Sequence, residues 1–301
     1  MLVVNNLKKE FKNITAVDDI SFSVEEGKIF GMLGPNGAGK TTTIRTVLNI
    51  IKPTSGEITF NGKQITTEFF NIIGYLPEER GLYKKSKVID VILYFAALKN
   101  MSKSDALEKA DEWMSKLEIS GLANKKIEEL SKGNQQKIQF ITSIIHNPKL
   151  LILDEPFAGF DPINQQLIKE MILSFTVSGK IIILSTHQME TAEKLCSEIF
   201  LINNGKKVVS GSVAQIKRKF GSNNIKLEYE GNGNLINNLP SVVHIDNYSN
   251  YAEIQLKDNV EPYEFLRTIV DKIKIKHFSV VEPTLHKIFI DVIHKNIPVK
   301  E

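Results

Sequence analysis

A glycine-rich run near residue 40 carries the clearest chemical signal of this sequence. The run reads Gly34-Pro35-Asn36-Gly37-Ala38-Gly39-Lys40-Thr41-Thr42 and matches the spacing G-x-x-x-x-G-K-[ST]. Its glycines allow backbone N–H groups to turn inward and surround phosphate oxygens without a clash from a Cβ atom. Lys40 would place an ammonium group on the β- and γ-phosphates, and the Thr41 hydroxyl would be a ligand of Mg²⁺. The run therefore predicts a phosphate-binding loop.

Two acidic residues follow an apolar segment about 110 positions later. Leu150–Leu153 is directly followed by Asp154 and Glu155. A buried strand would deliver these carboxylates to the carboxyl edge of a sheet, where ligands bind in open α/β folds. Asp154 would hold Mg²⁺ through a water, and Glu155 would polarise an attacking water as a general base. His187 ends the next apolar segment and would lie on the γ-phosphate side of the same edge, so Glu155 and His187 are the predicted catalytic residues.

A parallel sheet and a helix must position these groups. Residues 28–33 read as a buried strand and residues 41–48 as a helix, so the phosphates would meet a helix N-terminus with free N–H donors. The segments 150–154 and 180–185 are short, apolar and β-branched, as in strands buried on both faces. Residues 1–30 alternate like an antiparallel β region, and residues 86–147 read mostly as helix. The predicted class is α/β, with a mixed sheet core, an antiparallel β subdomain and a helical subdomain.

A change of pattern marks a predicted domain boundary near residues 211–224. The prediction divides the chain into a nucleotide-binding domain, 1–215, and a small accessory domain, 222–301. In the second part, strand-like and helix-like segments alternate in the order β-α-β-β-α-β. This order favours a small α+β domain of the ferredoxin-like kind.

Composition excludes several classes of protein. The net charge of +3 over 301 residues gives no indication of a basic surface for nucleic acid, so no nucleic-acid partner is predicted. Cys196 is the single cysteine and has no disulfide partner within the chain, as is usual in a reducing compartment. The apolar runs are far shorter than the ~20 residues that span a bilayer. The N-terminus shows no signal-peptide pattern, so the chain is predicted not to cross a membrane itself.

Residues 1 to about 215 resemble the ATP-binding subunit of an ABC transporter. Besides the phosphate-binding loop and the Asp154-Glu155 pair, two segments carry this resemblance. Leu130-Ser131-Lys132-Gly133-Asn134-Gln135-Gln136-Lys137 is similar to the family's LSGGQ signature, and Phe157-Ala158-Gly159-Phe160-Asp161 is similar to its D-loop. Residues 73–83 and 281–290 further resemble bacterial ATPase subunits of sodium- or drug-efflux exporters with a small C-terminal domain.

The resemblance implies an ATPase that uses ATP and Mg²⁺ and works with a separate membrane permease. It also implies a second ATPase subunit, either an identical copy or a paralogue. Ser131, Gly133 and Asn134 would then bind the γ-phosphate of the ATP that the second subunit holds. The implied location is cytoplasmic, peripheral on the inner face of the cell membrane.

Three positions depart from the family's pattern. Lys132 and Asn134 replace a glycine and a glutamine of the signature. Glu78 stands in a loop, residues 73–80, where the family offers a glutamine to the metal, and its carboxylate is still a hard ligand for Mg²⁺. Phe11 stands where an aromatic residue stacks on adenine, although a core phenylalanine is the alternative interpretation.

Two other functions stay open on the sequence alone. One is an ATP-binding regulatory cassette that does not hydrolyse ATP, which Glu78 and the altered signature would allow. The other is a soluble ABC ATPase that is not tied to transport. A DNA-repair type would need a long coiled-coil insertion, for which residues 86–130 leave no room. The accessory domain could regulate the ATPase, brace a dimer, or only add stability.

Overall fold

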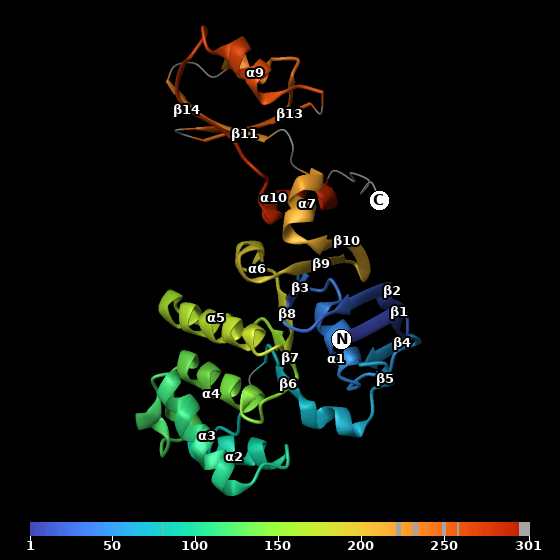
Figure 1. The fold of residues 1–301 in the computed structure, drawn as a ribbon, viewed down its shortest axis with the longest axis vertical. Helices are drawn as coiled ribbons and strands as arrows, with labels where there is room; N and C mark the ends of the chain where they lie inside the picture. The colour runs from blue at the N-terminus through green and yellow to red at the C-terminus, as the bar shows by residue number, and fades with distance from the viewer. Residues whose placement is uncertain (80, 221–223, 231–233, 249–250, 258, 295–301) are drawn as a thin grey trace. The chain divides into compact units, whose positions relative to one another are not determined.

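The computed structural model describes residues 1–301 except 80, 221–223, 231–233, 249–250, 258 and 295–301. The chain divides into two compact units, Met1–Gly211 and Ser212–Glu301 (Figure 1). Part of the predicted linker, residues 221–223, and part of a predicted turn, residues 249–250, lie outside the described residues. The division into domains 1–215 and 222–301 stays a prediction.

The first unit is built around a six-stranded sheet with the order β10-β9-β3-β8-β7-β6. Strand β3 pairs in parallel with β8 and β9, and β7 pairs in parallel with β6 and β8. Every residue of β3, β7 and β8 is buried, as expected for parallel strands covered on both faces. The strands are β3 (Ile29–Leu33), β6 (Ile73–Leu76), β7 (Leu150–Asp154), β8 (Ile181–Thr186), β9 (Glu198–Asn203) and β10 (Lys206–Ser212). The predicted α/β class is confirmed.

A second, antiparallel sheet with the order β2-β1-β4-β5 covers one side of this core. Phe22 on β2 stacks on Phe30 of β3 with ring centroids 5.1 Å apart, and it lies 5.3 Å from Phe200 of β9. Helix α1 (Lys40–Val47) contributes Ile44 and Val47 to the same hydrophobic cluster. The strands are β1 (Leu2–Phe11), β2 (Ile14–Val24), β4 (Ser55–Phe60) and β5 (Lys63–Gln64). The phosphate-binding loop therefore connects a closely packed strand, β3, to a helix, α1, that is packed into the same core.

A helical region lies between β6 and β7, as the sequence predicts. It contains α2 (Val88–Ala97), α3 (Lys103–Lys116) and α4 (Lys132–Ile144), and the 3₁₀ turns Thr67–Ile72, Ser120–Leu122 and Ile127–Glu129 precede or join them. One sequence expectation is wrong in detail: residues 73–76 form strand β6 rather than loop. Gly74 permits this strand because a Cβ there would come within 2.1 Å of the Ser143 carbonyl oxygen of α4. Two further helices, α5 (Pro162–Val177) and α6 (Met189–Leu195), follow β7 and β8.

The second unit contains an antiparallel sheet with the order β12-β13-β11-β14. This strand order, with a helix after the first strand and another after the third, is the predicted ferredoxin-like arrangement. Residues 213–220, which the sequence places within the boundary, form helix α7 of this unit, and α7 contacts α10. The elements are α7 (Val213–Phe220), β11 (Asn224–Glu230), α8 (Asn234–Asn237), β12 (Val242–Asn247), β13 (Ala252–Leu256), α9 (Pro262–Ile269), β14 (Lys274–Val280) and α10 (Leu285–His294).

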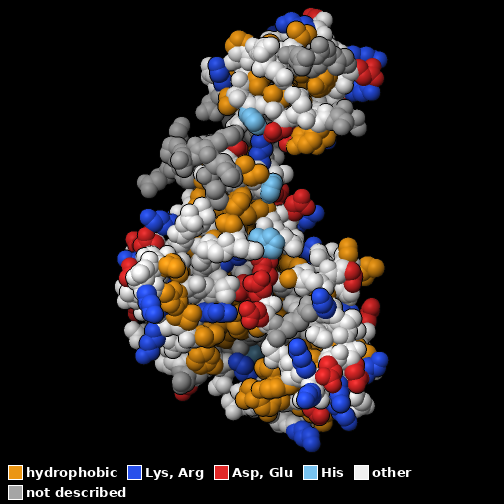
Figure 2. All heavy atoms as spheres, turned by 180° about the vertical axis from the view of Figure 1, so that it is seen from behind, with side chains coloured by type: hydrophobic (Ala, Val, Ile, Leu, Met, Phe, Trp, Pro, Cys, Tyr) orange, Lys and Arg blue, Asp and Glu red, His pale blue; other side chains and the backbone are white. Residues whose placement is uncertain are grey.

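Charged side chains of both signs are interspersed over the face drawn in Figure 2. Within the described parts of the chain, none of the helices has the length and apolar character that a membrane crossing requires.

Candidate functional site

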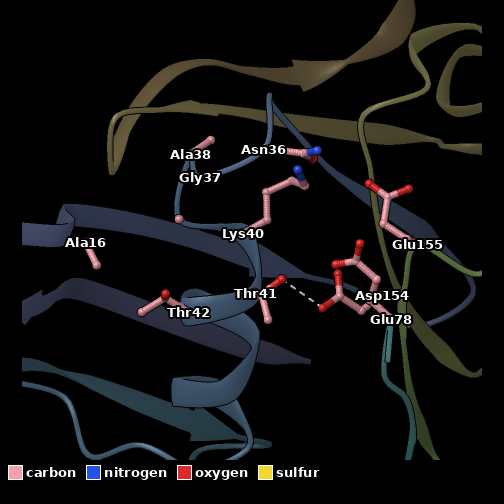
Figure 3. A pocket seen from close by; sticks show the side chains of 11 residues that line it. Ala16, Asn36, Gly37, Ala38, Lys40, Thr41, Thr42, Glu78, Asp154 and Glu155 are labelled. Carbon is pink, nitrogen blue, oxygen red and sulfur yellow. Dashed lines mark hydrogen bonds between the residues drawn. The ribbon is translucent and has the colours of Figure 1, made fainter. Parts of the chain in front are cut away.

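Most residues of the predicted phosphate-binding loop, together with Glu78, Asp154 and Glu155, line one cavity of about 350 Å³ at the carboxyl edge of β3 and β7 (Figure 3). Gly34, Pro35 and His187 are not among the residues that line it. The phosphate-binding loop and the start of α1 form one wall, and carboxylates form the opposite wall. The lining residues are Ala16, Asn36, Gly37, Ala38, Gly39, Lys40, Thr41, Thr42, Glu78, Asp154 and Glu155. Residues far apart in the sequence are thus brought together as the sequence analysis expects.

The phosphate-binding loop is held in a shape that only glycine allows at two positions. A Cβ at Gly34 would come within 2.2 Å of the Ile202 carbonyl oxygen. A Cβ at Gly39 would come within 2.5 Å of the Ala16 carbonyl oxygen, and the φ of Gly39 is 108°. Gly39 is also the N-cap of α1, so the free N–H groups of this helix point toward the cavity.

Lys40 is 6 % exposed and is the cation of this loop. Its Nζ donates hydrogen bonds to the carbonyl oxygens of Gly34, at 2.8 Å, and Pro35, at 3.1 Å. Burial lowers the pKa of Lys40, while the carboxylates of Glu155, Asp154 and Glu78 act in the opposite direction. Phosphate oxygens carry negative charge and would replace the two neutral carbonyls as stronger acceptors for the Lys40 ammonium.

Hard oxygen atoms gather beside Lys40. The Thr41 hydroxyl donates to Asp154 Oδ2 at 2.9 Å, and the Ser185 hydroxyl donates to Asp154 Oδ1. Glu78, from the loop after β6, lies next to Asp154 in Figure 3. Mg²⁺ in ATPases is bound through one or two carboxylates together with substrate phosphates. The donor set of Thr41, Asp154 and Glu78 fits that pattern.

Glu155 is 5 % exposed, and both of its carboxylate oxygens accept hydrogen bonds. Oε1 lies 2.9 Å from the backbone nitrogen of His187 and 2.7 Å from its Nδ1, and Oε2 accepts from the Thr186 hydroxyl at 3.1 Å. The backbone of Glu155 has a φ of 48°, which costs a residue with a Cβ about 1 kcal/mol or more. The chain therefore turns sharply at Glu155, and the carboxylate is directed against the end of β8.

The signature residues and Phe11 are not among the residues that line this cavity. The Ser131 hydroxyl caps α4 and accepts from the Asn134 backbone nitrogen at 3.2 Å, so Ser131, Gly133 and Asn134 form the start of that helix. Phe11 is 43 % exposed, and Lys9 Nζ lies 4.8 Å from the centre of its ring. The adenine-stacking role of Phe11 stays a prediction.

Sequence reasoning did not identify several residues of the site. Ala16 comes from β2, and its carbonyl oxygen lies against Gly39 and Gly205. The hydroxyl groups of Ser185 and Thr186 fix Asp154 and Glu155. These two could have been found, because they directly precede His187 at the end of β8. No local signal marks Ala16.

Comparison with known proteins gives two family matches along the chain. The family described as ABC transporter matches residues 17–158, and the ATP-binding protein DrrA1-3-like C-terminal domain matches residues 211–293. The ABC transporter ATP-binding protein YhaQ of Bacillus subtilis is 41 % identical over 97 % of this chain and 98 % of its own length. The chain belongs to the ABC transporter ATP-binding proteins.

Two further comparisons agree with this family. The linearmycin resistance ATP-binding protein LnrL of Bacillus subtilis is 29 % identical over 97 % of this chain and 98 % of its own. A solved structure, described as the ATP binding subunit of an ABC transporter, shares 27 % identity with a TM-score of 0.69, over 73 % of this chain and 93 % of that one. The predicted ABC fold and the resemblance to the family are both confirmed.

Proposed function

We propose that this ABC ATP-binding protein binds ATP with Mg²⁺, hydrolyses it, and thereby powers export through a separate membrane permease. ATP binding and hydrolysis are general to the family. The observation that best supports the proposal is the single cavity in which Lys40, Thr41, Asp154 and Glu155 meet. The phosphate-binding cation, the metal ligands and the general base of this proposal are all present in this cavity. Their presence argues against a cassette that binds ATP without hydrolysing it.

The functional side chains of the site have distinct tasks in this proposal. The N-terminus of α1 and the Lys40 ammonium bind the phosphates and stabilise the charge that develops during phosphoryl transfer. Thr41, Asp154 and Glu78 would hold Mg²⁺, which neutralises phosphate charge when bound. Glu155 accepts the proton of the attacking water, and His187 holds the Glu155 carboxylate in place through the contact at 2.7 Å.

The signature helix would serve a second ATP. Ser131 is exposed at the N-terminus of α4, and Gly133 and Asn134 in the first turn are half-buried. An accessible helix N-terminus binds anions through its free N–H groups and its dipole. Because these residues do not line the cavity of their own chain, we propose that they contact the ATP held by a second cassette. The pair would be an isologous dimer, or a heterodimer with a paralogue.

The export role rests on the relatives. LnrL is named for resistance to linearmycin, which supports removal of a compound from the cell as the task of this group. The proposed location is accordingly the cytoplasmic face of the cell membrane, through contact with the permease. The ferredoxin-like domain is proposed to regulate or brace the assembly.

Nucleotide affinity tests the core of this proposal. Lys40→Ala removes the loop cation and is expected to abolish measurable binding of the ATP analogue AMP-PNP by calorimetry. Lys63→Ala, on the exposed strand β5, is the matched control and should bind normally. Near-normal affinity of Lys40→Ala would refute the role of the phosphate-binding loop.

Turnover and partners test the rest. ATP hydrolysis by the wild-type protein is expected, and binding without turnover would support the non-hydrolysing alternative. Co-purification with a membrane permease is expected if the chain serves transport. A cassette that hydrolyses ATP but is isolated from the cell without any membrane protein would contradict the export role.

A further inference from the structure

A buried side-chain amide on α4, the helix that begins at the signature residues, forms hydrogen bonds to the loop that carries Glu78. Gln139 lies on α4 and is 4 % exposed. Its Nε2 donates hydrogen bonds to the carbonyl oxygens of Pro77, at 3.2 Å, and Glu79, at 3.1 Å. These two carbonyls stand on either side of Glu78, whose side chain lines the nucleotide cavity. One amide group therefore holds the backbone before and after Glu78.

The orientation of this amide follows from the chemistry of its partners. Carbonyl oxygens only accept hydrogen bonds, so the NH₂ group of Gln139 must face them. Its Oε1 is buried and has no hydrogen-bond partner among the described residues. Leaving a buried acceptor unpaired is unfavourable. An apolar side chain of similar shape would fill the same space without that penalty, so the two donated bonds are the specific contribution of Gln139.

The segment that leads to Glu78, residues 73–79, also contacts the helical region at its first residue. The carbonyl oxygen of Ile73, at the start of β6, accepts from Lys99 Nζ at 3.0 Å and lies 2.8 Å from His146 Nε2. Gly74, the next residue, packs against the Ser143 carbonyl of α4. Residues 73–76 are thus held by these contacts as well as by the pairing of β6 with β7, and the loop that carries Glu78 continues from them.

The position of Gln139 links two functional parts of the molecule. Ser131, the cap of α4, precedes Gln139 by eight residues, which is about 12 Å along a helix. A shift of α4 along or about its axis would move the Pro77 and Glu79 carbonyls, and with them the Glu78 carboxylate. The start of the signature helix and the carboxylate beside Asp154 are therefore mechanically connected through one side chain.

We propose that Gln139 is a positioning residue that places the Glu78 carboxylate beside Asp154 for the metal. Displacement of α4, where the second ATP is proposed to bind, would then change how tightly the metal is held in the first site. The inference rests on the proposed function, in which Glu78 is a ligand of Mg²⁺.

The test measures how strongly Mg²⁺ improves binding of AMP-PNP. The quantity is the ratio of two affinities from calorimetry, one in Mg²⁺ and one in EDTA. Glu78→Ala and Gln139→Met should each lower this ratio about tenfold, as loss of a ligand or of its hydrogen-bonded support commonly does. The affinity in EDTA should stay at the wild-type value in Gln139→Met and should not fall in Glu78→Ala, which removes a negative charge near the phosphates. The affinity in Mg²⁺ should fall in both variants. The double variant should lose no more than either single variant.

Two further variants separate positioning from general damage to α4. Thr142→Val removes another buried donor of α4, a hydroxyl outside the signature that bonds within the helix to the Gln139 carbonyl at 2.7 Å, and should leave the ratio unchanged. Gln139→Lys should restore the ratio, because an ammonium group also donates to paired carbonyls, as Lys99 does with Phe70 and Ile73. If Gln139→Met does not fold, Gln139→Asn, which is one methylene too short to reach both carbonyls, tests the same loss.

The outcomes distinguish the role of Gln139 from the role of Glu78. A wild-type ratio in Gln139→Met, together with a lowered ratio in Glu78→Ala, would overturn the positioning role and leave the metal role of Glu78 intact. Losses that multiply in the double variant would overturn it as well. A wild-type ratio in Glu78→Ala would show that Glu78 does not hold the metal, and the inference about Gln139 would fall with it.

Discussion

Replacement of Glu155 by glutamine should remove catalysis while leaving the site intact. The side-chain oxygen of glutamine can still accept from the His187 backbone nitrogen, which lies 2.9 Å from Glu155 Oε1. The new NH₂ group would face the Thr186 hydroxyl, which can rotate to accept it. Neither residue is branched at Cβ, so the φ of 48° is equally tolerable. We expect the free energy of unfolding to change by less than about 1 kcal/mol.

The effect on chemistry should be much larger. Glutamine cannot accept the proton of the attacking water, and a general base contributes about 10²–10⁴-fold to a rate. At about 1.36 kcal/mol per tenfold, the barrier should rise by about 2.7–5.4 kcal/mol. Lys40, Thr41 and Asp154 are unchanged, so ATP binding should survive. If ATP bridges two cassettes, the variant should accumulate as an ATP-bound dimer.

Phosphate release in a single turnover measures the loss of rate, and calorimetry with AMP-PNP measures binding. Glu108→Gln, an exposed change on α3, is the matched control and should retain activity. A decrease of less than tenfold in Glu155→Gln would refute the role of Glu155 as the base. Size-exclusion chromatography with light scattering, at high protein concentration with ATP and Mg²⁺, reports the dimer. A variant that binds ATP tightly but stays monomeric would refute the homodimer and favour a paralogous partner.

Two other predictions concern the C-terminal unit and the half-buried side chain of His146. A chain that ends at Gly211 should bind AMP-PNP as the full chain does, because every residue that lines the cavity precedes residue 156; a folded truncation that fails to bind would contradict this. Burial, with a smaller effect of Lys99, lowers the pKa of His146 to about 4. The unfolded chain takes up this proton first, near pH 6.5, so the free energy of unfolding should fall by up to about 3 kcal/mol from pH 7 to pH 4. Urea unfolding should show a weaker pH dependence in His146→Gln, and an equal dependence would exclude His146 as its cause.

The pattern of neighbouring residues was sufficient to predict those parts of the molecule that a single continuous segment forms. The glycine run predicted both the strand before it and the helix after it, because loop, strand and helix together form the motif. The runs at 150–154 and 181–186 consist of buried, mostly apolar residues and so were recognisable as strands of a parallel sheet. The strand order of the second unit followed from its alternation of strands and helices.

Features that depend on contacts between distant segments were not predictable in this way. Strand β6 is only four residues long and contains Gly74, which is explained only by the approach of Ser143 from α4. Ala16 enters the site through a backbone carbonyl, so its side chain gives no signal. Gln139 looks like an ordinary polar residue of a helix until the fold brings it to the carbonyls of Pro77 and Glu79.

The glycines of the phosphate-binding loop predict an uneven tolerance to sequence variation. At Gly34 and Gly39 a Cβ would overlap a backbone carbonyl that cannot move away, so every other amino acid should be rejected there. At Gly37 nothing lies within 4 Å of the point that a Cβ would occupy, and only the φ of 79° opposes a side chain. Asparagine adopts such backbone angles more readily than most residues. A saturation library of the loop, selected for nucleotide binding, should therefore recover asparagine at 37 while remaining pure glycine at 34 and 39.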